Sequence, residues 1–150
     1  AGNSVHLRTY PDVPATWADD VLNTKWSKVR SLRRVITGAL EVARANKEIG
    51  ASLQAHPVVY ADADLRDAVA DMDMATLCIT SGITFADGDA PADAYRLEDV
   101  AGVAVVVEKA PGDKCERCWK VLDEVGADSE HETLCHRCVD AVRHRDAAAA

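Results

Sequence analysis

The sequence predicts an α+β protein with a long N-terminal helix, a small α/β domain and a C-terminal four-cysteine zinc ribbon, in that order. Three observations support this prediction. Apolar residues recur at steps of three and four in residues 16–50, short apolar runs lie in residues 51–110, and two Cys-x-x-Cys pairs lie in residues 111–146. A chain of 150 residues has room for one ordinary domain or two small ones.

Residues 1–50 are expected to form an extended leader and one long helix. Thr16–Asp19 has the pattern of a capping box, and Gly50 is a typical C-terminal stop, so the helix is expected between them. Trp17 and Trp26 are interpreted as core anchors. One apolar stripe along the helix should be buried, formed by Leu22, Trp26, Val29, Leu32, Ile36, Leu40 and Ala43.

Residues 51–110 are expected to form the small α/β domain. Asp62–Asp71 is predicted to be a short helix, and Thr84–Ala94 has the acidic and glycine-containing composition of a surface loop. Cys78 is expected to be a small buried hydrophobic residue. Three apolar runs are predicted strands: Val58–Tyr60, Ala75–Thr80 and Val103–Val107.

Residues 111–146 contain four of the five cysteines, in the order Cys-x2-Cys-x16-Cys-x2-Cys. That spacing is typical of a structural zinc site, in which two tight turns supply two thiolates each. Four thiolates leave no open coordination position, so one structural Zn²⁺ is predicted. His131 and His136 lie nearby and are alternative zinc ligands, but a histidine ligand would break the symmetry of the two Cys-x-x-Cys pairs. The predicted ligands are Cys115, Cys118, Cys135 and Cys138, and residues 147–150 form a tail without predicted structure.

The charge of the chain argues against several classes of partner. With 17 basic and 25 acidic residues the net charge is −8, which disfavours membrane surfaces and indiscriminate nucleic-acid binding. Nothing resembles a secretory leader or a membrane span, so a reducing cytoplasmic setting is expected. The first residue is Ala rather than Met, which favours a piece of a longer protein. Residues 23–50 carry a local positive charge that could meet a polyanion.

Two groups of residues are candidates for contact with RNA. Arg117 and Trp119 lie in or beside the first cysteine pair, where an exposed aromatic ring next to basic residues would be a platform for base stacking. Equally, Trp119 could cover the metal site or dock onto the α/β domain. The helix residues Arg30, Arg33 and Arg34 lack interleaved acids and favour phosphate contact, although a solvated face is the alternative. No catalytic set and no phosphate-binding loop are found in this chain.

Several motifs resemble the bacterial isoleucyl-tRNA synthetases. The Lys-Cys-Glu-Arg-Cys-Trp string at Lys114–Trp119 is the most specific, and it follows a helix signature between residues 26 and 55. Ser4–Leu7 and Leu134–Cys138 are similar as well. The resemblance runs from about residue 4 to residue 139, which is nearly the whole chain.

The resemblance implies a part of a class I synthetase, which activates isoleucine with ATP and transfers it to its tRNA. It implies the end of the anticodon-binding helical bundle in residues 1–50, a junction domain in residues 51–110 and a zinc module in residues 111–146. The partner would be the anticodon arm of isoleucine tRNA, and the protein is expected to be monomeric. ATP would be used by the whole enzyme without binding to this part, because the catalytic signatures of the family are absent from this chain.

Two alternatives share the four-cysteine ribbon. DNA glycosylases of the formamidopyrimidine type end in a similar finger, but they also need an N-terminal Pro-Glu and a helix-two-turn-helix. This chain opens Ala1-Gly2-Asn3, and an acidic α/β stretch precedes its ribbon. A free-standing, zinc-dependent protein-interaction module is the third possibility.

Overall fold

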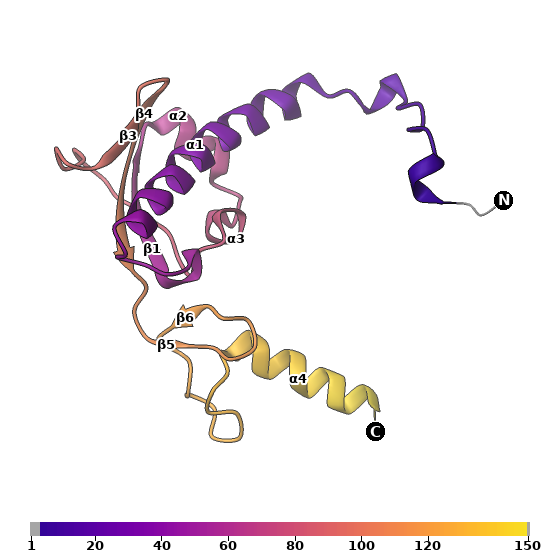
Figure 1. Cartoon of the computed structure of the whole chain (residues 1–150), viewed down its shortest axis with the longest axis vertical. Coiled ribbons are helices and arrows are strands. Elements are labelled where there is room, and N and C mark those ends of the chain that lie inside the picture. Colours follow the sequence, from indigo (N-terminus) through magenta and orange to yellow (C-terminus); the bar gives the residue numbers. More distant parts are fainter. Residues whose placement is uncertain (1–3, 150) are drawn as a thin grey trace.

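The long helix α1 runs from Asp20 to Ala45 and crosses the α/β domain in the computed structural model, which describes residues 4–149 (Figure 1). It begins later than predicted, because the carboxylate of Asp19 accepts the N–H of Leu22 at 2.8 Å and so caps the helix there. Two 3-10 turns precede it, η1 (Val5–Leu7) and η2 (Ala15–Trp17). The helix also ends earlier than Gly50, and Lys47 turns the chain with a φ of 61°.

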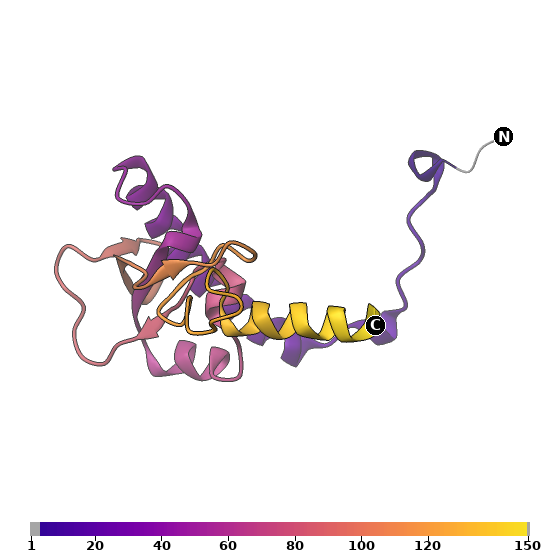
Figure 2. The ribbon, with the colours of Figure 1, turned by 90° about the horizontal axis from the view of Figure 1, so that it is seen from below.

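The buried face of α1 covers the sheet, and the prediction of the stripe holds only for its C-terminal part. Val29, Leu32 and Ile36 are at most 1% exposed, whereas Leu22 is 50% and Trp26 is 36% exposed. Trp17 is 74% exposed, so the interpretation of the two tryptophans as core anchors was wrong. The N-terminal turns of α1 extend beyond the sheet (Figures 1 and 2), and Val21 and Leu22 are at least half exposed there.

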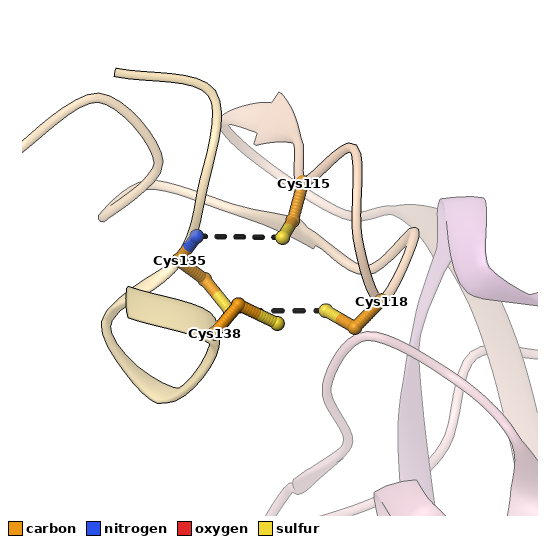
Figure 3. Close-up of side chains that lie close together, drawn as sticks. All are labelled: Cys115, Cys118, Cys135 and Cys138. Atoms are coloured by element: carbon orange, nitrogen blue, oxygen red, sulfur yellow. Dashed lines mark hydrogen bonds between the residues drawn. The ribbon is translucent and has the colours of Figure 1, made fainter. Parts of the chain in front are cut away.

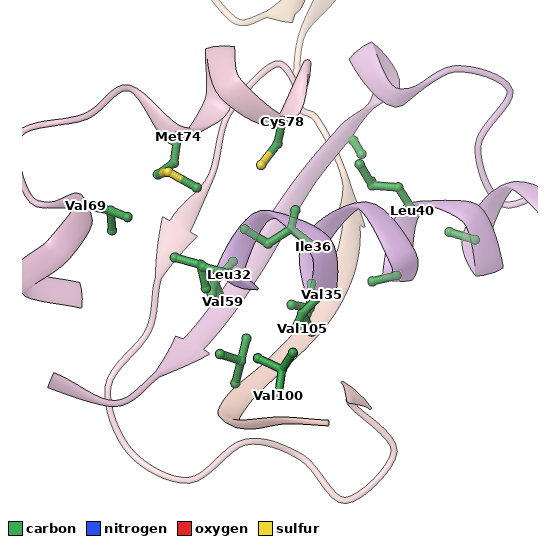
Figure 4. Packing of buried hydrophobic residues seen from close by; sticks show 14 of the residues in the cluster. Leu32, Val35, Ile36, Leu40, Val59, Val69, Met74, Cys78, Val100 and Val105 are labelled. Atoms are coloured by element: carbon green, nitrogen blue, oxygen red, sulfur yellow. The ribbon is translucent and has the colours of Figure 1, made fainter. Parts of the chain in front are cut away.

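The main sheet has the strand order β2-β1-β4-β3 and confirms the predicted α+β class. Strand β1 pairs antiparallel with β4, so that Val59 lies opposite Val105; both are almost fully buried beneath α1 (Figure 4). The predicted strands at residues 58–60 and 103–107 are therefore confirmed. The strands are β1 (Ala55–Ala61), β2 (Thr84–Phe85), β3 (Tyr95–Leu97) and β4 (Val100–Lys109), and η3 (Ser52–Gln54) leads into β1.

Two short helices connect β1 to its parallel neighbour β2. Helix α2 (Ala63–Val69) lies within the predicted helix, but α3 (Met74–Cys78) replaces the strand that was predicted for residues 75–80. That prediction was wrong because the local polar residues favour a helix. Asp73 accepts the backbone N–H of Thr76 at 2.9 Å, which caps α3, and Ile79 ends the helix in the left-handed conformation with a φ of 57°.

The ribbon lies beside the end of the α/β domain opposite to the leader (Figure 1). Its strands β5 (Asp113–Lys114) and β6 (Val121–Leu122) form a two-stranded antiparallel sheet. Gly112 has a φ of 93° and lies so close to the backbone of Leu122 that a side chain has no room there. Helix α4 (His136–Ala149) then projects away from the body of the molecule (Figure 2) and includes the predicted tail as far as residue 149.

Among residues 4–149, no helix combines the length and the apolar composition that a membrane crossing requires.

Candidate metal centre and the surface around it

The structure brings the four predicted cysteine ligands together. Cys115 and Cys118 follow β5, and Cys135 and Cys138 lie at the start of α4 (Figure 3). All four sulfur atoms lie within 4.8 Å of one another, and the Sγ atoms of Cys118 and Cys135 are 3.7 Å apart. Three of the four residues are at most 1% exposed, and Cys118 is half-buried. The sulfurs thus form a compact cluster with one partly open side.

Each cysteine pair is held by a tight backbone turn. The N–H of Trp119 donates to the carbonyl of Cys115 at 2.8 Å, and the N–H of Cys138 donates to the carbonyl of Cys135 at 2.9 Å. The two turns are joined where the N–H of Cys135 points at the Sγ of Cys115, with an N–S distance of 3.4 Å. These bonds place both sulfurs of each pair on the side that faces the other pair.

The cluster fits a tetrahedral zinc ion. Zn–S bonds of about 2.3 Å place the sulfurs of a regular tetrahedron about 3.8 Å apart, close to the 3.7 Å between the sulfurs of Cys118 and Cys135. Within the described residues the cluster consists of cysteines alone. His136 instead lies near Glu124, whose Oε2 is 3.4 Å from the Nδ1 of the ring. Four thiolates fill the coordination shell, so such an ion would hold the ribbon together rather than bind a reactant.

The cysteines do not favour the thiolate form equally. Burial acts to raise the pKa of the Cys115 thiol, but backbone N–H groups lower it overall. Burial raises the pKa of Cys135 far above the usual range of a thiol. A dication at the centre is therefore what would allow all four sulfurs to be deprotonated together.

Arg117 faces the sulfur cluster. Its Nη1 donates to the Sγ of Cys138 at 3.6 Å, and this hydrogen bond raises the pKa of the guanidinium above its ordinary value. A tetrathiolate zinc centre has a net charge of about −2, because four thiolates surround one dication. Arg117 therefore offsets negative charge at the centre.

Trp119 lies at the surface of the ribbon with 61% of it exposed. Its φ of 66° is in the left-handed region, which is strained for a large side chain. The amine of Lys114 lies over the indole ring, 5.4 Å from its centroid. The structure therefore holds an exposed aromatic ring and a cation next to the sulfur cluster.

The three candidate arginines on α1, Arg30, Arg33 and Arg34, lie outside the ribbon. Arg33 donates from Nε to the carbonyl of Leu77 at 2.8 Å, and Arg34 forms an ion pair with Asp99 at 2.6 Å. Arg30 bonds within its own helix, to the Oγ of Ser27 at 3.1 Å. The structure thus places these three residues on α1, away from Arg117 and Trp119 in the ribbon.

Sequence reasoning missed the acidic partners of the basic residues on α1. Besides Arg34, Lys25 pairs with Asp71 at 2.8 Å and Lys28 pairs with Asp64 at 2.5 Å. These partners are 36 to 65 residues away in the chain. No local spacing rule connects such positions, because only the fold brings them together.

Comparison with known proteins separates the two enzyme classes that share this finger. Residues 112–141 match the family described as "Zinc finger found in FPG and IleRS". The similarity extends well past the finger: the chain is 51% identical to the isoleucine–tRNA ligase of Brucella abortus biovar 1 (strain 9-941) over 145 residues, which cover 96% of this chain. The resemblance to the isoleucyl-tRNA synthetases is confirmed.

Other relatives give the same result. The isoleucine–tRNA ligase of Mesorhizobium japonicum is 54% identical over 129 residues, which are 83% of this chain and 13% of that protein. The isoleucine–tRNA ligase of Agrobacterium fabrum is 47% identical over 141 residues, which are 93% of this chain and 15% of that protein. The chain thus spans about 15% of the length of the synthetases that it matches.

Proposed function

We propose that this chain is the C-terminal, non-catalytic region with which a monomeric isoleucyl-tRNA synthetase recognises the anticodon arm of its tRNA. The observation that carries the proposal is the match to one segment of isoleucine–tRNA ligases over 96% of the chain. Activation of isoleucine with ATP and its transfer to tRNA would belong to the other parts of such an enzyme.

Residues 111–146 would be the zinc module of that enzyme. One Zn²⁺ bound by Cys115, Cys118, Cys135 and Cys138 would fix the two turns relative to each other, and its closed shell gives it a structural role. Few large apolar side chains pack around the cysteines, so metal binding supplies much of the folding free energy of this module.

Trp119 is the residue on which we expect a base of the anticodon loop to stack. Proteins read single-stranded RNA by stacking unpaired bases on aromatic rings, and the exposed indole is held in place by the cysteine turn. The nearby charges of Lys114 and Arg117 would attract the RNA although the whole chain is acidic. Arg117 contributes mainly through its charge, since one of its amino groups points at Cys138.

The arginines of α1 are secondary candidates for phosphate contact. Arg30 bonds only to a side chain one turn earlier, so its charge can reach a phosphate with little rearrangement. Arg33 and Arg34 would first have to give up their bonds to Leu77 and Asp99. Among the three, we therefore rank Arg30 first.

Residues 1–50 would form the end of the anticodon-binding helical bundle, and residues 51–110 the junction domain. The leader and the first turns of α1 expose a series of large apolar side chains, which agrees with an element that completes its packing against other helices. These residues are Val5, Leu7, Tyr10, Val13, Trp17, Val21, Leu22 and Trp26.

The test of this function is Trp119→Ala in the full-length enzyme. Loss of one stacked base should weaken tRNA affinity about 5- to 150-fold, because stacking contributes about 1–3 kcal/mol per base. Isoleucyl-adenylate formation and zinc content should stay at the level of the unchanged enzyme. Trp119→Phe is the matched control, since it keeps an aromatic face and should retain most of the affinity.

Two results would contradict the proposal. In the first, tRNA affinity survives in Trp119→Ala while zinc is lost, which would make the ring a cover for the metal site. In the second, the unchanged protein prefers duplex DNA to isoleucine tRNA in a competition assay, which would favour the glycosylase-type use of the finger.

A further inference from the structure

Ser81 lies between the α/β domain and the ribbon and bonds to both. Its hydroxyl accepts the N–H of Val121, the first residue of β6, at 2.7 Å. The same hydroxyl donates to the carbonyl of Leu53 in η3 at 2.5 Å. Only 7% of the residue is exposed, so both hydrogen bonds are shielded from water.

The α/β domain fixes the position of this hydroxyl. Ser81 follows the left-handed end of α3, where the N–H of the fully buried Thr80 returns to the carbonyl of Ala75 at 2.9 Å. The N–H of Ser81 itself donates to the carbonyl of Ala55 at the start of β1, at 3.2 Å. The backbone N–H groups of Ser81 and of the residue before it are thus both bonded to the domain, and they fix the turn that carries the side chain.

On the ribbon side, Val121 begins the strand that follows the first cysteine turn, which carries two of the predicted ligands and Trp119. Val121 pairs with Lys114 in the small sheet, and the carbonyl of the preceding residue, Lys120, accepts the N–H of Cys115 at 2.8 Å. Trp119 lies two residues before Val121 in the chain. A bond that holds Val121 therefore also limits the movement of the first cysteine turn.

We propose that Ser81 is a positioning residue, which sets the orientation of the zinc ribbon relative to the α/β domain. A covalent linker between β4 and β5 connects the two units (Figure 1), and the Ser81 hydroxyl also joins a backbone carbonyl of one unit to a backbone N–H of the other. The coupling of the two units needs no assumption about RNA. Its consequence for tRNA rests on the proposed function: the bond would present Trp119 at a fixed place relative to α1.

The first experiment compares the zinc-loaded chain with Ser81→Ala by ¹⁵N relaxation and amide hydrogen exchange. In the unchanged chain, amides of the ribbon and of β4 should report one common rotational correlation time. In Ser81→Ala the ribbon amides should tumble separately, and the Val121 amide should exchange about tenfold faster. Zinc content and the exchange of Val59 and Val105 should not change.

Three further variants sharpen the comparison. Ser81→Thr keeps the hydroxyl and should restore common tumbling. Ser129→Ala removes an exposed serine of the ribbon and should have no effect. Val121→Pro removes the donor from the ribbon side without altering the α/β domain, so it should loosen the ribbon as Ser81→Ala does and serves if that variant fails to fold.

Common tumbling in Ser81→Ala, or in Val121→Pro where Ser81→Ala does not fold, would overturn the proposal. In the full-length enzyme, Ser81→Ala should weaken tRNA affinity several-fold while adenylate formation is unchanged. If the ribbon tumbles separately but neither Ser81→Ala nor Trp119→Ala affects tRNA affinity, the coupling stands and the proposed function fails. If Trp119→Ala weakens tRNA affinity but the ribbon of Ser81→Ala does not loosen, the proposed function stands and the coupling through Ser81 fails.

Discussion

The cysteine turn holds Trp119 in a strained backbone conformation. A left-handed backbone is normally occupied by glycine, and a large residue there costs about 1–3 kcal/mol. Trp119 nevertheless adopts a φ of 66°, because its N–H closes the turn on Cys115 and Cys118 precedes it directly. The strain is local, and the ring that it presents is exposed.

This strain predicts a difference between two variants that both lack the ring. Trp119→Gly should give a ribbon about 1 kcal/mol more stable than Trp119→Ala, because only glycine adopts this backbone without penalty. Thermal unfolding of the zinc-loaded ribbon and competition for zinc with a chelator would measure the difference. Both variants should lose tRNA affinity equally. Equal stability of the two ribbons would show that the turn carries no strain.

At the scale of elements, patterns that repeat along the chain were predictable and local polar bonds were not. The valine-rich runs at residues 58–60 and 103–107 became paired strands, and the buried part of α1 follows the apolar stripe from Val29 onward. The segment Ala75–Thr80 is also largely apolar, yet α3 forms there, where the carboxylate of Asp73 caps a helix just before it. A local cap and burial of the helix against the core thus outweigh the propensity of a short apolar run.

The candidate site was predictable to a similar degree. The spacing of the cysteines located the cluster, because two short turns must bring each pair together. The contact of Arg117 with Cys138 and the ion pair of Arg34 with Asp99 could not be predicted from the sequence, since they depend on side-chain directions and on residues far away in the chain. Trp26 was misread because the apolar stripe continues toward the N-terminus of α1 past the part of the helix that packs on the sheet.

The cap on α3 predicts a measurable loss of stability in the α/β domain. Asp73→Ala should cost about 1 kcal/mol, the usual effect of losing an N-cap bond. Asp62→Ala is the control: Asp62 precedes α2 without a side-chain capping bond, so its cost should be smaller. Denaturant unfolding of the two variants at pH 7 would give both values, and a larger loss for Asp62→Ala would contradict the role of the cap.

The same cap also gives a pH dependence. The bond from the Thr76 hydroxyl, and then that from its backbone N–H, lowers the pKa of Asp73 below its ordinary value. A carboxyl with a lowered pKa contributes stability that is complete above its unfolded pKa and is lost as the pH falls through the folded value. The difference between the unchanged chain and Asp73→Ala should therefore shrink on acidification below pH 4.

At the scale of the whole molecule, two kinds of core hold the chain. The α/β domain buries a continuous set of apolar side chains between α1 and the sheet (Figure 4), whereas the ribbon packs around its cysteines with few apolar neighbours. The first is held by the hydrophobic effect, and we expect the second to need a bound metal. Removal of zinc should therefore unfold the ribbon while the α/β domain persists.

The five cysteines report on the two cores separately. After chelation at pH 8, the four ribbon thiols should react quickly with a disulfide reagent, while Cys78 should stay protected. Its side chain is buried in the α/β core, and burial raises the pKa of the thiol to about 11. Only about one molecule in a thousand then holds the reactive thiolate at pH 8, and this fraction increases about tenfold for each unit of pH.

Counting the reactive thiols decides whether the two cores are independent. Four fast thiols after chelation and a fifth only in denaturant are expected, and Cys78→Ala should remove the fifth alone. Five thiols reacting together on chelation would show that the α/β domain unfolds with the ribbon and that the proposed division at residue 110 is wrong. No reactive thiol on complete zinc removal would show that the ribbon folds without its metal. The expected outcome follows from the structure because Cys78 belongs to the apolar cluster beneath α1, which contains none of the four ribbon cysteines.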